Sequence, residues 1–203
     1  MSHQLLREFG HGLIEVDGEK YLIIPSFANI SNIGPPREIV ETINTMMTSR
    51  KVVDVVGSAS LILQSCCDKD LPTSFIGETV STVSGLKYKP GKRLGTNGIN
   101  DIVSWALHCI KHGIQGAQLT DDESKGEPME EFHASDFITK AATYFKMSYE
   151  EAAKMTMTQF VMRMEEEFPQ TKQDSNKINV DGKEFQRFDD SISRAAEEEK
   201  ARG

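Results

Sequence analysis

The sequence predicts a mainly α-helical protein, with a helical body, a short N-terminal β-hairpin, a smaller C-terminal helical unit and a flexible acidic tail. Three observations support this fold class. Apolar residues recur at intervals of three, four and seven over much of the chain, as they do on one face of a helix. Capping patterns and prolines mark the ends of these segments. One strong strand signal precedes them, because Asp17-Gly18 lies between two β-prone runs within residues 13–24.

The helical body follows the hairpin. Gly34-Pro35-Pro36 opens a first helix, since proline is tolerated in a first helical turn. A second helix is expected from Val52 to Cys67 and a third over Ile99–His112, where Gly113 should end it as a left-handed cap. Residues 72–98 are rich in glycine, and we expect a loop there with one short irregular helix at most. The apolar positions of the three helices are Ile39, Val40, Ile43, Met46 and Met47; Val52, Val55, Val56, Ala59, Leu63 and Cys66; and Ile102, Val103, Ala106, Leu107 and Ile110.

The C-terminal unit carries clear helix boundaries. A helix is expected over Ala134–Met147, and Ser148 with Glu151 forms a capping-box pattern for a short helix that follows. Thr156 with Gln159 repeats the pattern before a last helix that ends at Phe168, ahead of Pro169. The buried stripe of this last helix should consist of Phe160, Val161, Met164 and Phe168.

Charge and composition divide the chain into four parts: residues 1–117 as hairpin plus helical body, 118–131 as an acidic linker, 132–169 as a small helical unit, and 170–203 as a polar tail without stable structure. The net charge is −8, and all of it falls after residue 117. Such a surface repels phosphate backbones and disfavours nucleic-acid binding, although a small basic patch at Lys87, Lys89, Lys92 and Arg93 stays open as an alternative to a solvated loop. No apolar run is long enough to span a membrane, and no secretory signal is evident.

The sequence contains no recognisable set of catalytic residues, so we expect that the protein is not an enzyme and binds no cofactor. His108 and His112 share a helix face, but the Glu that follows the first His in metalloproteases is absent, and we expect no metal site. Cys66-Cys67 lacks the spacing of redox motifs, and both residues should act as small buried hydrophobes. With three cysteines in all, a disulfide framework is not expected, and a reducing, cytoplasmic compartment fits best.

Methionine is concentrated in the C-terminal unit, where six of the nine methionines lie within residues 129–164. Flexible, polarisable methionine side chains are frequent on surfaces that bind helices. Met157 and Met162 fall off the predicted buried stripe and are expected to be exposed. The candidate partner-binding residues are therefore Phe137, Met157, Phe160 and Met162.

Three stretches of the chain resemble a family of phage proteins. They are residues 24–40 (IPSFANISNIGPPREIV), residues 63–71 (LQSCCDKDL), and the C-terminal run that contains Asp136-Phe137-Ile138, Met155-Thr156-Met157-Thr158-Gln159-Phe160 and Phe168-Pro169. Together they resemble the tail assembly chaperones of long-tailed bacteriophages over most of residues 20–170.

The resemblance implies a non-catalytic, mostly helical protein made in the cytoplasm of the infected bacterial host. It implies binding to the tape-measure protein, whose apolar helices such chaperones keep soluble, and recruitment of the tail-tube protein. The methionine-rich cluster leaves self-association of this chain open as an alternative to helix binding. Such chaperones leave before the virion matures, so the protein should be absent from mature particles.

Three alternatives stay open. A structural minor tail or connector protein would persist in purified particles. A helix-turn-helix regulator could be built from the capped helices at 148–168, although Glu165, Glu166 and Glu167 suit a DNA groove poorly. A zinc-dependent enzyme would have to use His108 and His112.

Overall fold

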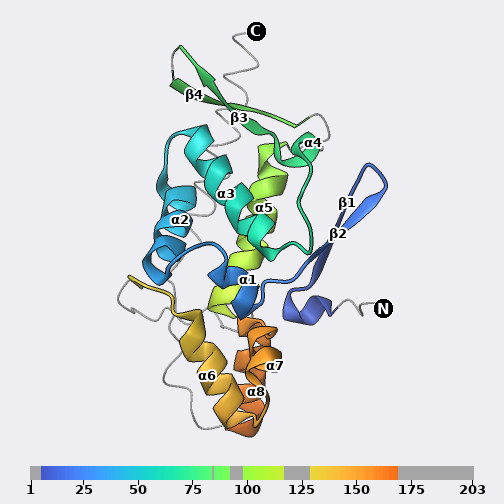
Figure 1. Cartoon of the computed structure of the whole chain (residues 1–203), viewed down its shortest axis with the longest axis vertical. Helices are drawn as coiled ribbons and strands as arrows, with labels where there is room; N and C mark the ends of the chain where they lie inside the picture. The colour runs from blue at the N-terminus through green and yellow to red at the C-terminus, as the bar shows by residue number, and fades with distance from the viewer. Residues whose placement is uncertain (1–5, 84, 92–97, 117–128, 169–203) are drawn as a thin grey trace.

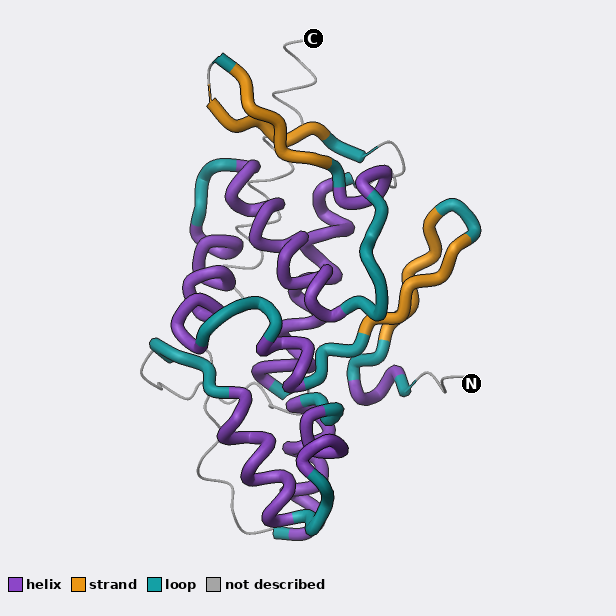
Figure 2. The backbone as a smooth tube through the Cα atoms, viewed as in Figure 1, coloured by secondary structure: helices purple, strands orange, loops and turns teal. Residues whose placement is uncertain are grey.

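The computed structural model describes residues 6–83, 85–91, 98–116 and 129–168 and shows a mainly α protein with two antiparallel hairpins (Figures 1 and 2). The mainly α fold class and the N-terminal hairpin are confirmed. The helices are η1 (Arg7–Phe9), α1 (Phe27–Ser31), α2 (Pro36–Thr48), α3 (Val52–Cys66), α4 (Thr73–Ile76), α5 (Ile99–Ile110), η2 (Lys111–Gln115), α6 (Ala134–Tyr144), α7 (Tyr149–Ala153) and α8 (Met157–Glu167); the strands are β1 (Gly12–Val16), β2 (Glu19–Ile23), β3 (Glu78–Thr82) and β4 (Gly85–Lys89).

The first hairpin turns where the sequence predicts. Asp17 and Gly18 adopt φ values of 54° and 81°, as the two-residue turn requires, and Val16 pairs with Glu19. Burial alternates along β1, so Ile14 and Val16 face the core while the residues between them face solvent. The hairpin thus presents one apolar face to the body and leaves the other free.

The helical body consists of α2, α3 and α5. Its buried residues follow the predicted stripes except at Val52, which is 45% exposed because it begins α3 at the edge of the body. Pro36 occupies the first position of α2, and Ile39, Val40, Ile43 and Met46 of that helix are buried. Helix α3 ends one residue earlier than predicted, at Cys66. It packs along α5 through the centre of the body (Figure 1).

A second hairpin replaces the loop predicted for residues 72–98. After the short helix α4, strands β3 and β4 pair from Glu78↔Lys89 to Thr82↔Gly85. The residues of β3 are β-prone, but no Asn-Gly or Asp-Gly turn separates the two strands. The sequence therefore shows the composition of a strand without the turn that would predict a hairpin. Tyr88 joins the hairpin to α4 by donating a hydrogen bond to the Ile76 carbonyl oxygen over 3.1 Å, and β4 contacts α3 of the body.

The long helix at 99–112 does not end at Gly113, which corrects the predicted left-handed cap. The helical conformation continues through η2, a π-helical turn, and stops at Gly116, whose φ is 81°. Gly113 is buried instead, and a Cβ at that position would lie 2.8 Å from Ile30. Its small size allows α1 to approach η2 closely.

The C-terminal unit has the predicted caps. Both capping boxes form, with Ser148 and Glu151 at α7 and with Thr156 and Gln159 at α8. Helix α6 ends at Tyr144, three residues earlier than predicted. The prediction that Phe168 belongs to the buried stripe of the last helix is wrong. Its side chain is 42% exposed, because the helix ends at Glu167 and leaves it beyond the packed surface.

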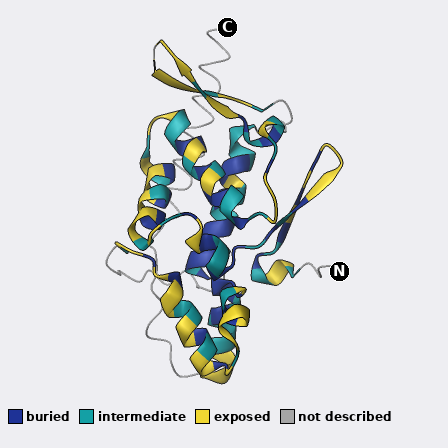
Figure 3. Ribbon diagram, viewed as in Figure 1, coloured by how far each residue is buried: buried dark blue, intermediate teal, exposed yellow. Residues whose placement is uncertain are grey.

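A single hydrophobic cluster joins the C-terminal unit to the body. The Phe27 backbone N–H donates to the Met155 carbonyl oxygen over 2.9 Å, and Ser26 forms an isolated β-bridge with Thr156. Figure 3 shows buried residues continuing from α3 and α5 through α1 into α6–α8. Most of the predicted linker (residues 118–128) and the predicted tail lie outside the described residues. No described helix is long and apolar enough to cross a membrane.

Candidate partner-binding site

Phe137 lies at the centre of an aromatic cluster. Its ring stacks on Phe27 of α1 at 5.6 Å between centroids and on Phe132 at 5.4 Å, and it meets the edge of Phe160 at 5.7 Å. Phe145 adds a further edge contact to Phe160 at 5.7 Å. Edge-to-face and offset-stacked pairs of this kind add to the stabilisation that burial gives. The cluster therefore fastens α6 and α8 onto α1.

This position makes Phe137 and Phe160 contributors to the core. Phe160 is only 8% exposed, and Phe137 is half-buried with Lys140 Nζ 5.6 Å from the centre of its ring. The structure thus brings two of the four candidate residues together, but it places them where a partner would meet at most the rim of Phe137.

Met157 and Met162 lie apart on α8. Met157 is 4% exposed, which corrects the expectation that it faces solvent. It is the first residue of α8, and this end of the helix packs against η2, with the Met157 side chain close to Gly116. Met162 lies about one and a half turns further on and is half-buried. Of these two methionines, only Met162 has a side chain that a partner could contact.

The exposed apolar surface of this unit lies at its far end. Tyr144, Tyr149 and Phe168, called here the aromatic tip, are all exposed, and the rings of Tyr144 and Phe168 meet at 5.8 Å. Tyr144 and Phe168 lie at the ends of α6 and α8, at the lower end of the molecule in Figure 1, and Tyr149 is the first residue of α7. Sequence reasoning misses this surface because the spacing of Phe168 fits the buried stripe.

Negative charge surrounds the aromatic tip. Residues 129–168 carry eight acidic and four basic side chains, and three of the acidic ones, Glu165–Glu167, are exposed in the last turn of α8. Arg163 lies over the Phe145 ring at 4.7 Å and near Glu167 at 3.9 Å, so its charge is partly offset. The tip is an apolar surface with an acidic border.

His108 and His112 lie together without the surroundings of a metal site. Their rings are 4.5 Å apart; His108 Nε2 donates to the Gly10 carbonyl oxygen at 2.9 Å, and His112 Nδ1 lies 3.0 Å from Thr158 Oγ1. Burial, together with the nearby His108 and Lys111, lowers the pKa of His112 to about 4. Among the described residues, no group of three or more His, Cys, Asp or Glu side chains could hold a metal ion.

The three cysteines are free thiols in or near the core. Cys66 and Cys109 are buried, and Cys67 is half-buried. Burial, together with the nearby Cys66 and Asp68, raises the pKa of Cys67 to about 12. A hydrogen bond with Cys66, together with burial, raises the pKa of Cys109. Thiols held in the protonated form are poor nucleophiles, so these cysteines are suited to packing.

The predicted basic patch is only partly described. Lys89 pairs with Glu78 across the second hairpin at 2.9 Å, and Lys87 is exposed on β4. Lys92 and Arg93 lie outside the described residues.

Comparison with known protein families finds one family whose sequence model matches this chain. Residues 49–182 match a family of unknown function, DUF6246. The chain belongs to this family. The match begins just before α3 and takes in α5, η2 and the whole C-terminal unit with its aromatic tip. No curated protein and no solved structure matches the chain.

Proposed function

We propose that this DUF6246 protein is a non-catalytic tail assembly chaperone of a long-tailed bacteriophage. It binds apolar helices of the tape-measure protein in the cytoplasm of the infected host, helps to recruit tail-tube subunits, and leaves before the virion matures. The resemblance of residues 24–40, 63–71 and 136–169 to such chaperones supports this role.

The observation that carries the proposal is the aromatic tip with its acidic border. Exposed aromatic side chains that lie together are characteristic of protein-binding surfaces. An amphipathic helix can place its apolar face on Tyr144 and Phe168 while basic residues beside that face meet Glu165–Glu167. Met162, on the same helix α8, is half-buried and offers further apolar surface to a partner. A long, apolar helical protein with basic flanks is the kind of partner that this surface suits.

The test is co-expression with the tape-measure protein encoded near this chain, followed by pull-down and measurement of the soluble fraction. We expect the two proteins to co-purify and the tape-measure protein to stay soluble only in the presence of this chain. Tyr144→Asp combined with Met162→Asp should abolish both effects. Tail-tube subunits added to the complex should be retained on it and not on this chain carrying the two substitutions.

The matched control is Leu86→Asp, which places a carboxylate on another exposed apolar side chain, on β4 at the opposite end of the molecule (Figure 1). Binding by the control variant should equal that of the wild type. Failure of the wild type to associate would overturn the proposal. So would finding this chain in purified particles in fixed ratio to the tail proteins, since that marks a structural component.

A further inference from the structure

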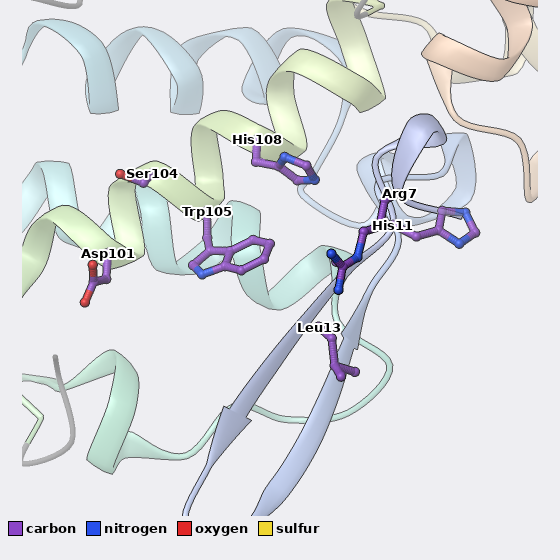
Figure 4. A pocket seen from close by; sticks show the side chains of 8 residues that line it. Arg7, His11, Leu13, Asp101, Ser104, Trp105 and His108 are labelled. Atoms are coloured by element: carbon purple, nitrogen blue, oxygen red, sulfur yellow. The ribbon is translucent and has the colours of Figure 1, made fainter. Parts of the chain in front are cut away.

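A groove separates the N-terminal segment from helix α5. It has a volume of about 450 Å³, within the range of ordinary ligand sites, and is lined by η1, the start of β1 and one face of α5. Figure 4 shows Asp101, Ser104, Trp105 and His108 in order along α5, with Arg7 between Trp105 and His11. None of these residues belongs to the aromatic tip.

The groove exists because of two glycines. Gly12 lets the strand lie against the indole, since a Cβ there would be 2.5 Å from Trp105 Cζ3. Gly10, at φ 88°, turns the chain so that its carbonyl oxygen accepts the His108 hydrogen bond. The N-terminal segment is thereby held beside α5, with the Arg7 side chain between Trp105 and His11.

Three of the polar side chains along this groove lack protein partners in the part of the chain that the structure describes. Within the described residues, Arg7 and Asp101 make no ion pair, and the indole N–H of Trp105 makes no hydrogen bond. A cation lies toward one end and an anion at the other, with an aromatic surface between them. This arrangement is complementary to a ligand that carries both charges around an apolar group.

The length of the groove indicates an extended peptide. Asp101 and His108 are seven residues apart on α5, which corresponds to roughly 10 Å at 1.5 Å per residue. An extended chain covers this distance in about three residues. A peptide with an acidic and a basic residue three positions apart, and an apolar residue between them, matches the charges and the aromatic surface together.

We propose that the groove between η1–β1 and α5 binds an extended peptide segment of this kind. The apolar side chain packs on Trp105, the acidic side chain pairs with Arg7, and the basic side chain pairs with Asp101. The inference does not depend on the tail-assembly role, since it concerns a different surface.

The single tryptophan of the chain is a built-in reporter. Blocked peptides Lys-Phe-Ala-Glu and Glu-Ala-Phe-Lys, which present the two charges in both chain directions, are titrated into the full-length protein while tryptophan fluorescence is recorded. We expect a saturable change with a Kd below about 1 mM for at least one of them. Peptides Lys-Ser-Ala-Glu and Glu-Phe-Ala-Glu should bind more weakly.

Two variants and one control locate the site. Arg7→Glu and Asp101→Asn should each weaken binding about fivefold. Lys20→Glu changes the net charge as Arg7→Glu does, but Lys20 is exposed on β2 and does not line the groove, so this variant should bind like the wild type. The proposal is overturned by the absence of saturation at about 1 mM or by equal binding in Arg7→Glu. Equal binding of Lys-Phe-Ala-Glu and Glu-Phe-Ala-Glu would also overturn it, since the groove would then be a general apolar site.

Discussion

The imidazole Nδ1 of His112 lies 3.0 Å from the hydroxyl oxygen of Thr158, and this contact joins the end of the long helix to the start of α8. The same imidazole fills the space that a side chain at Gly10 would need. His112 therefore lies where the N-terminal segment, the helical body and the C-terminal unit meet, and its protonation affects all three.

The stability of the fold should fall as the pH drops from about 6.5 to about 4. Burial, His108 and Lys111 lower the pKa of His112 from 6.5 to about 4 in the folded protein. The unfolded chain consequently binds a proton that the folded chain does not bind in this window, and acid favours unfolding. Urea midpoints measured from about pH 7 to about pH 4 should show the decline.

His112→Gln should flatten this pH dependence, because it removes the titrating group. His133→Gln is the matched control, since His133 is an exposed histidine outside the helices, at the N-terminal boundary of α6. A decline that is identical in His112→Gln and the wild type would assign the effect to other groups.

Truncating Phe137 should destabilise the protein by about 3 kcal/mol, toward the lower end of the range for Phe→Ala because the ring is half-buried. The substitution removes two stacked pairs and one edge contact that hold α6 against α1 and α8. Tyr149→Ala, at an exposed aromatic residue of the same unit, should change the stability by less than about 0.5 kcal/mol. Urea unfolding followed by circular dichroism measures both, and equal costs would contradict the central position of Phe137.

The same substitution should have opposite effects at two glycines. Gly57 is exposed in the middle of α3 with open space around its missing Cβ, so Gly57→Ala should stabilise the protein by about 0.5–1 kcal/mol. Gly12→Ala forces a Cβ into Trp105 and should destabilise it by about 1–3 kcal/mol. Thermal unfolding gives the signs, and Gly12→Ala should also shift the tryptophan emission. A stable Gly12→Ala variant with unchanged emission would contradict the described contact.

The cysteines should resist thiol-specific reagents in the folded protein. Cys66 and Cys109 are buried, and the pKa of Cys67 is raised to about 12, so little thiolate exists near pH 8. Ellman's reagent should detect almost no thiol under native conditions and all three in urea. Ile23 of β2 forms an isolated β-bridge with Cys67 just after α3. Rapid reaction of one thiol in the native protein would show that this bridge opens easily.

The helices could be predicted from the sequence because their signals are local. Pro36 marks the start of α2, and Ser148 and Thr156 begin the two capping boxes, so each boundary is encoded within a few residues. The hairpin at Asp17-Gly18 belongs to the same class, since the turn residues themselves have the required φ values. Local chemistry and the final fold agree at these points.

The candidate site could be predicted only in part because burial depends on distant partners. Met157 falls off the apolar stripe of α8, yet η2 covers it, and nothing in the sequence near Met157 indicates that contact. Phe168 is the opposite case, since its spacing fits the stripe but the helix ends before it. The groove at Arg7 and Trp105 is likewise built by residues nearly a hundred positions apart, which no local pattern reveals.

The hydrogen bond from Phe27 to Met155 has a consequence for how the chain is made. A ribosome releases α1 long before α6–α8 exist, so Phe27, fully buried in the finished protein, keeps part of its apolar surface uncovered until Phe137 and Phe160 pack on it. Closure of the core is thus a late event in synthesis. Fragments that stop ahead of Ala134 should aggregate, while the chain extended through Phe168 can complete its fold.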